Sequence, residues 1–209
     1  MKNNKKMPNT TIYEKGLQSK LKEKKAREIL NKAGDRYLDL YAGREMYSNH
    51  ALRKHLEENI LPGIALYQSL LDDDETQDRA IELAEIAFRE LSLSNRKMIE
   101  RLGKMPIYYG LMRAMIKRMM RLNFPAEGWD TEWVEVSGKE IAFNMKRCFY
   151  LDVLEKYGVV ELTILYCRMD DWIYKNSSPF VNWARKKTLG QGDECCDFRF
   201  EHVGTNNSS

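Results

Sequence analysis

The chain has 209 residues, 43% of them hydrophobic and 31% charged, with a formal net charge of +3 at pH 7. We expect one soluble globular domain, because this length can bury a sizeable core and this composition is ordinary for that class. No apolar run approaches the roughly 20 residues of a membrane helix, and no apolar segment follows the basic start MKNNKK, so we expect neither a transmembrane protein nor a secretory signal.

The N-terminus carries most of the positive charge. Residues 1–32 hold ten Lys or Arg and three acids, and residues 1–12 are polar and include Pro8, which predicts a disordered basic tail over 1–12. Such a region could bind nucleic acid or an anionic membrane, but a solvated tail and helix face are the more common outcome. No aromatic residues lie among the basic residues of 1–6 and 15–32, so we expect no stacking platform for single strands. With the solvated tail as the more common outcome, we expect no nucleic-acid and no membrane partner.

Helical periodicity then dominates the chain as far as residue 124. Pro62-Gly63 should break or kink the helix that precedes it. The acidic run Asp72-Asp73-Asp74 is typical of a helix start rather than of a metal site. Ser94-Asn95 should cap a short helix of its own. The helices expected before residue 105 are about 17–41, 45–61, 64–71, 75–91 and 95–102.

Residues 105–122 predict a Met-rich helix. Its broad apolar face contains Ile107, Leu111, Met112, Met115, Ile116, Met119 and Met120. We expect a core helix in which flexible Met side chains adapt to their neighbours. One alternative is a surface helix that binds a partner or a membrane; the partner could be a second copy of the chain, in a homodimer. Another is that the flexible Met side chains form the wall of an apolar pocket.

The character of the sequence changes after residue 128. Residues 133–136 and 141–148 alternate like strands around a Ser137-Gly138 turn, and two helices follow over about 150–157 and 161–174. Residues 181–189 and 195–200 predict a second hairpin, because Gly190 and Gly192 suit a tight turn. The order β-β-α-α-β-β gives antiparallel pairs, so the predicted class is α+β, with the helical part packed on a four-stranded antiparallel sheet. We expect a single domain over 13–203, with helical part 13–124 and sheet part 130–203, and a disordered tail over 204–209.

The last predicted strand separates its side chains into two faces. Cys195, Asp197 and Arg199 share one face, and Cys196, Phe198 and Phe200 share the other. The aromatic face should be packed, whereas the thiol, carboxylate and guanidinium face a surface or a polar pocket. Cys196 and Asp197 therefore point to opposite sides, which argues against a shared site.

Three kinds of side chain in the C-terminal part could carry chemistry. Cys148, Cys167 and Cys196 (or its neighbour Cys195) lie on different elements, and the absence of a disulfide framework favours reduced thiols in a cytoplasmic protein. Without paired Cys or His at ligand spacing they do not predict a metal site. Asp170, Asp171 or Asp197 could act as general acid or base if buried, and Arg199 or Arg185 could hold a substrate carboxylate. Small buried thiols and surface ion pairs are the ordinary alternatives.

Several short motifs resemble those of one known family. They are Cys196-Asp197-Phe198-Arg199-Phe200 with the preceding Thr188-Leu189, Cys148-Phe149-Tyr150, Glu161-Leu162 with Cys167-x-x-Asp170, and Trp183-x-Arg185-x-x-Thr188-Leu189. Over about 45–201 the chain resembles the L-2-amino-thiazoline-4-carboxylic acid hydrolase family. It departs from the family pattern at Lys186, where Thr is usual.

The resemblance implies a hydrolase that opens a cyclic amidine, or a related C–N bond, of a small carboxylate-bearing substrate to give an N-carbamoyl product. It implies catalytic residues among Cys167, Asp170, Cys196 and Asp197. It also implies substrate binding by Arg199, Arg185, Cys148 and Thr188, and no cofactor, with metal dependence left open. Either water or a thiolate activated by a nearby cation would attack the amidine carbon. The competing hypothesis is a non-catalytic small-molecule sensor with a fold similar to vinyl-reductase domains.

Overall fold

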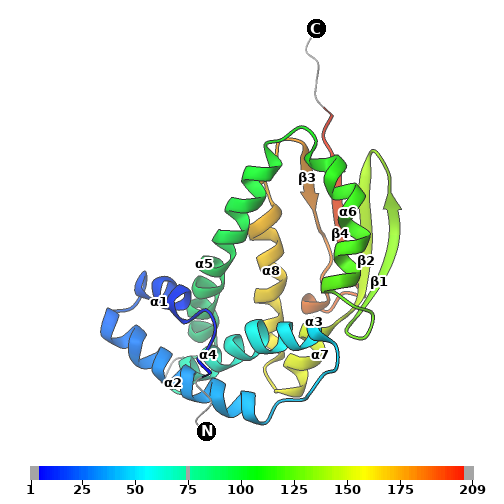
Figure 1. The fold of residues 1–209 in the computed structure, drawn as a ribbon. Coiled ribbons are helices and arrows are strands. Elements are labelled where there is room, and N and C mark those ends of the chain that lie inside the picture. Colours follow the sequence, from blue (N-terminus) through cyan, green and yellow to red (C-terminus); the bar gives the residue numbers. More distant parts are fainter. Residues whose placement is uncertain (1–4, 74–75, 205–209) are drawn as a thin grey trace. The chain divides into compact units, whose positions relative to one another are not determined.

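The computed structural model describes residues 5–73 and 76–204 (Figure 1). The chain divides into two compact units, which are unit 1 (Met1–Leu91 and Val153–Leu165) and unit 2 (Ser92–Asp152 and Tyr166–Ser209). The sequence predicts one domain without this division, because helical periodicity carries no information about which helices pack together. None of the described helices is both long and apolar enough to cross a bilayer.

Helices make up the chain up to residue 123. They are α1 (Thr10–Gln18), α2 (Glu23–Ala42), α3 (His50–His55), the π-helix η1 (Leu56–Ile60), α4 (Leu61–Leu71), α5 (Gln77–Gly103) and α6 (Tyr108–Asn123). The positions of α1 and α2 correct the predicted N-terminal tail and first helix. Residues 10–12 begin α1 and Met7 is buried, so the described part of the predicted tail is not disordered; residues 1–4 lie outside the described range. Two helices replace the one predicted over 17–41.

Two further helix boundaries differ from those predicted. Pro62 does not end its helix: α3, η1 and α4 are continuous, and the π-turns of η1 precede the missing N–H of the proline. Ser94 and Asn95 lie inside α5, because the apolar repeat of that helix continues past them and the capping signal is overridden. Asp74, in the acidic run, lies outside the described residues.

The C-terminal part has the predicted element order. It comprises β1 (Trp129–Val136), β2 (Glu140–Cys148), α7 (Phe149–Lys156), the 3-10 helix η2 (Val160–Leu162), α8 (Thr163–Tyr174), β3 (Val181–Ala184), the 3-10 helix η3 (Leu189–Gln191) and β4 (Cys196–His202). The four strands form one antiparallel sheet in the order β1-β2-β4-β3. The predicted α+β class is therefore confirmed. β3 is shorter than predicted, because residues 185–188 leave the sheet as an irregular segment before η3 begins at Leu189. Of the predicted C-terminal tail, residues 205–209 lie outside the described range.

Unit 1 has a core of buried aromatic and aliphatic side chains. Tyr13 of α1 stacks on Phe88 of α5 with ring centroids 6.2 Å apart. Gly16 allows the same two helices to approach closely, since a Cβ there would lie 2.9 Å from the α-carbon of Ala87. Tyr67 of α4 donates a 2.7 Å hydrogen bond to Glu161 in η2. These contacts fix α1, α4, α5 and η2 within the unit.

In unit 2 the sheet presents one aromatic face to two helices. Register places Trp133, Ile141, Phe143, Met145, Trp183, Cys196, Phe198 and Phe200 on that face. At one side of it, α6 contacts the sheet through Tyr109 stacked on His202, with ring centroids 4.4 Å apart, and through Lys117 over the Trp133 ring. At the other side, Tyr174 of α8 packs against Trp183 and Phe200 (Figure 1). The face-by-face alternation predicted for β4 is confirmed.

The Met-rich helix is the main correction within unit 2. The sequence predicts that α6 is a core helix, but Ile107, Leu111, Met115, Met119 and Leu122 are between 44% and 64% exposed. Only Tyr108, Tyr109 and Met120 of α6 are buried. One apolar stripe of this helix is therefore uncovered within the described chain.

Candidate functional site

Three thiols, a carboxylate and a guanidinium converge in unit 2. Cys167 and Asp170 lie one turn apart on α8, Cys196 begins β4, and Cys148 ends β2. Arg185 immediately follows β3. The charges of Cys167 and Asp170 both influence the pKa of Cys148, and those of Arg185 and Asp170 influence the pKa of Cys167. A catalytic site built from these side chains requires them to lie this close to one another.

Arg185 joins α8 to the sheet. Its side chain is only 3% exposed, and its Nη1 donates to Asp170 Oδ2 at 3.0 Å. Its Nη2 donates to Asp171 Oδ2 at 2.8 Å and to the backbone carbonyl of Cys167 at 2.6 Å. The guanidinium also lies over the rings of Trp183 and Phe198. Both terminal nitrogens are engaged within the protein, so Arg185 is poorly placed to hold a substrate carboxylate.

Cys167 and Cys196 form a hydrogen-bonded thiol pair next to η3. The thiol of Cys196 donates to the sulfur of Cys167, and the backbone N–H of Gly190 donates to that same sulfur. The N–H of Leu189 donates to Cys196 Sγ at 3.3 Å. Two consecutive N–H groups of one short helix therefore point at two sulfurs, an arrangement that stabilises negative charge.

The three thiols of the cluster differ in pKa because their surroundings differ. Hydrogen bonding from Cys196, the charge of Arg185 and the N–H of Gly190 together lower the pKa of Cys167 despite its burial. The pKa of Cys196 is raised, because its proton is held in the bond to Cys167 and because it is buried. Burial raises the pKa of Cys148 to about 11, although the N–H groups of Leu151 and Tyr150 act against that shift. Among the thiols of this cluster, Cys167 is therefore the one whose environment favours the thiolate form.

Asp170 is a carboxyl group with a pKa close to neutrality. Although 35% of its side chain is exposed, the dense protein around it desolvates the carboxyl and raises its pKa to about 6; the guanidinium of Arg185 opposes the rise and the charge of Asp171 adds to it. Asp171 in turn accepts a 2.9 Å hydrogen bond from Trp183 Nε1. A carboxyl with this pKa can exchange a proton near neutral pH, which is the property required of a general acid or base.

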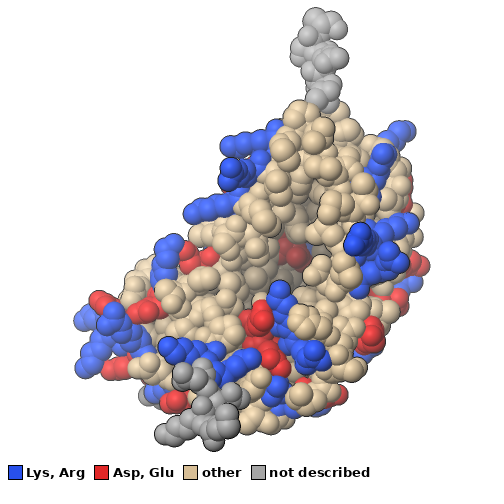
Figure 2. All heavy atoms as spheres, in the orientation of Figure 1, with Lys and Arg blue, Asp and Glu red and all other residues tan. Residues whose placement is uncertain are grey.

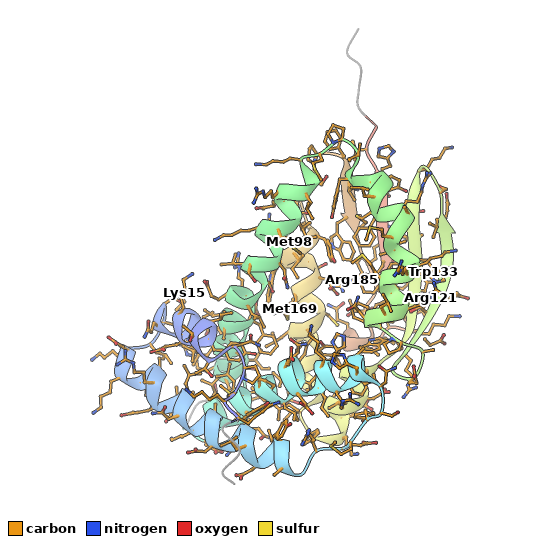
Figure 3. The ribbon with its side chains drawn as sticks, viewed as in Figure 1. Lys15, Met98, Arg121, Trp133, Met169 and Arg185 are labelled. Carbon is orange, nitrogen blue, oxygen red and sulfur yellow. The ribbon has the colours of Figure 1, made fainter. Side chains whose placement is uncertain are left out.

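The cluster is accessible from one side. The side chains of Asp170 and Asp171 remain 35% and 41% exposed, and Phe198 is only partly buried although β4 is a central strand. Figure 2 shows the surface hollowed between α6 and α8 of unit 2, with acidic atoms in its depth. Figure 3 places Arg185 in the space between those helices. A small molecule could therefore approach the carboxylates.

The structure does not bring every predicted residue to this cluster. Asp197 accepts hydrogen bonds from the backbone N–H groups of Lys186 and Lys187, at 2.8 and 2.6 Å, and so closes the turn before η3. Arg199 donates to the carbonyls of Phe143 and Phe198 and to Asn144 on the other face of the sheet. Both positions follow from the alternation of β4, which predicts that Cys196 and Asp197 diverge.

Thr188 contributes through the backbone. Its N–H donates to Asp193 at 2.8 Å, and its carbonyl accepts from the N–H groups of Gln191 and Asp193. These bonds shape η3, which presents Leu189 and Gly190 to the sulfurs. The sequence predicts no role for those two N–H groups, because a main-chain donor leaves no mark in residue type. It predicts Asp171 only as one of three carboxylates, without its link to Arg185.

Other candidate sites are less well equipped. Within residues 5–73 and 76–204, no three His, Cys, Asp or Glu side chains are arranged to hold a metal ion. A broad surface groove of unit 1 has described lining residues that include Met7, Asn9, Asn31 and Asp35, but no thiol or imidazole. The cluster of unit 2 is therefore the best candidate among the described residues.

Comparison with known proteins bears on the family. The profile described as L-2-amino-thiazoline-4-carboxylic acid hydrolase matches residues 53–200, which include every member of the cluster. A search of curated proteins found no match. Among solved structures, the crystal structure of the Fe(II) unliganded H-NOX protein from K. algicida aligns with 96% of this chain and 99% of its own, at 11% identity. Its TM-score of 0.29 is too low to establish a shared fold.

Proposed function

The chain belongs to the L-2-amino-thiazoline-4-carboxylic acid hydrolase family, and on this premise we propose that it hydrolyses a small cyclic amidine with the thiolate of Cys167 as nucleophile. The observation that carries the proposal is the hydrogen-bonded environment of Cys167. Its sulfur receives hydrogen bonds from Cys196 and Gly190 and lies in the field of Arg185, whereas burial raises the pKa of Cys148 and of Cys195. A stabilised thiolate is the form of cysteine that attacks an electrophilic carbon.

The reaction can be written with balanced atoms. The Cys167 thiolate forms a bond to C2 of the protonated amidine, and the bond between C2 and the ring sulfur breaks, which leaves an isothiourea on the enzyme. Water then forms a bond to C2, the bond from C2 to Cys167 breaks, and the N-carbamoyl product leaves with a free thiol. One water is consumed. The ring bond that opens in this scheme is C–S, rather than the C–N bond first expected.

Asp170 is the proton carrier of this scheme. As a carboxylate it holds the amidinium by charge-assisted hydrogen bonding, and it accepts the proton of the attacking water in the second step. Its pKa of about 6 keeps it mostly ionised at neutral pH. Cys196 acts as a positioning residue, because its hydrogen bond reaches the reacting carbon only through Cys167.

Substitution of Cys167 tests the proposal. The substrate is L-2-amino-Δ2-thiazoline-4-carboxylate, and the thiol released from the ring reports turnover. Cys167→Ser should lower kcat by ~10³-fold or more, since removing a nucleophile abolishes the covalent route. Cys195→Ser is the matched control. Cys195 is also buried and adjoins Cys196, yet its thiol lies in the field of Lys187, Asp197 and Arg199, so turnover should be unchanged.

Two results would overturn the proposal. Undiminished turnover by folded Cys167→Ser would assign the attack to water instead. Binding of the thiazoline without any turnover by the wild-type protein would favour the small-molecule sensor.

A further inference from the structure

The exposed apolar stripe of α6 faces the helix that carries the cluster. Tyr108, at the start of α6, lies close enough to Tyr174 of α8 to influence its pKa. Lys117 points the other way, over Trp133 on the edge strand β1. On a helix of 3.6 residues per turn, Met115 and Met119 lie on the Tyr108 side and opposite Lys117. This spacing places them on the side of α6 that is turned toward α8, and Figure 2 shows the surface hollowed between these two helices.

The floor of this groove changes from apolar to acidic along its length. Phe198 lies on the face of the sheet that α6 and α8 contact, and its ring stacks on Phe143 with centroids 4.8 Å apart. Beside Phe198 lie Arg185 and its two carboxylate partners, Asp170 and Asp171. Two carboxylates against one guanidinium leave an excess of negative charge at that end.

We propose that the groove binds an amphiphilic amidine, whose cationic head is held by Asp170 and Asp171 and whose apolar substituent lies along Met115 and Met119 of α6. This inference rests on the proposed function and specifies its substrate class. An amidinium matches the charge of the acidic end and can donate two parallel hydrogen bonds to a carboxylate. A substituent that covers the stripe removes exposed Met and Leu surface from water. A substrate carboxylate gains less here, because Arg185 is already saturated by its partners.

Calorimetry on the Cys167→Ala variant tests this directly, because binding is then measured without turnover. The probes are 2-amino-4-phenyl-Δ2-thiazoline and the 4-carboxylate compound. We expect the phenyl compound to bind ~10-fold tighter or better, which is the effect of burying one aromatic group. Met115→Lys or Met119→Lys, added to Cys167→Ala, should remove that preference. Val134→Lys is the matched control, since Val134 is an equally exposed apolar residue of the same unit, on β1.

The results separate this inference from the hydrolase proposal. Equal or weaker binding of the phenyl compound, or a preference that survives both Met substitutions, overturns the groove assignment even if the wild-type protein hydrolyses the carboxylate compound. Tight, Met115-dependent binding of the phenyl compound supports the assignment even if the wild-type protein hydrolyses neither probe, in which case only the catalytic proposal fails. Both Met side chains are exposed, so these variants should fold, which circular dichroism will verify.

Discussion

Cys167 and Cys196 carry the same functional group, yet their pKa values move in opposite directions. The difference arises from one shared proton. Cys196 donates it, and is therefore kept as a thiol, whereas Cys167 accepts it and is stabilised as a thiolate. A third thiol, Cys148, receives backbone hydrogen bonds as well, but burial dominates there and its pKa rises to about 11. In the proposed scheme, hydrogen-bond direction rather than proximity alone selects the nucleophile.

Asp170 should set the acid limb of the pH–rate profile. The scheme requires its carboxylate, and its pKa is raised to about 6, so kcat/KM should fall as the pH drops through that value. Asp170→Asn should remove this limb and lower the rate by about 10² to 10⁴-fold, the usual contribution of acid–base catalysis. Because the folded-state pKa is the higher one, the same group should also make the protein less stable as the pH rises from about 4 to 6. A limb near 6 that persists in Asp170→Asn would refute the assignment.

At the scale of elements, Arg185 connects α8 to the end of β3. It is almost fully buried, and its partners Asp170 and Asp171 would lose their cation if it were removed. Removing Arg185 is costly, because it leaves the partly exposed Asp170 and Asp171 without their cation and the backbone carbonyl of Cys167 without its donor. The connection therefore stabilises unit 2 as well as the thiolate of Cys167.

Arg185→Gln should lower the free energy of unfolding by roughly 3 kcal/mol and raise the pKa of Cys167. Arg147→Gln is the control in the same unit, since its ion pair with Asp152 is exposed and should be worth less than about 1 kcal/mol. Urea denaturation measures both variants. Equal losses for the two would show that burial of Arg185 contributes nothing.

A pair of glycines in unit 1 offers a second contrast. A Cβ at Gly16 would lie 2.9 Å from a backbone atom of α5, whereas a Cβ at Gly34 of α2 meets nothing within 4 Å. Gly16→Ala should therefore destabilise the protein, and Gly34→Ala should stabilise it by about 0.5 to 1 kcal/mol through helix propensity. Thermal unfolding of the two variants measures whether each substitution raises or lowers the stability. A neutral or stabilising Gly16→Ala would contradict the close approach of α1 to α5.

Elements and faces are predictable where local periodicity decides them. The alternation of β4 correctly separates Cys196 from Asp197, and the order of strands and helices gives the α+β class. Tertiary contacts decide the rest. Nothing in Cys167-x-x-Asp170 indicates that Arg185 is saturated, and the N–H groups of Leu189 and Gly190 cannot be inferred from side-chain types. The exposure of the α6 stripe likewise depends on what packs against it, which periodicity does not encode.

At the scale of the whole molecule, the exposed stripe of α6 has two competing uses. If it binds ligand, the chain has no need of a second copy to cover it, and sedimentation should show a monomer at micromolar concentration. A dimer that dissociates on Met115→Lys would assign the stripe to a homodimer interface. The melting temperature discriminates equally well, because only an associating protein has a concentration-dependent value.

The most direct test of the central claim, that folding creates a single activated thiolate, is competitive alkylation of the four cysteines across a pH series, read out by peptide mass spectrometry. The intact protein carries its own controls, because the pKa values of Cys148, Cys195 and Cys196 are all raised. We predict that Cys167 is labelled first, with a midpoint below the ordinary value of 9 for a cysteine thiol. Labelling of Cys195 or Cys196 ahead of Cys167, or a Cys167 midpoint above 9, would contradict the account.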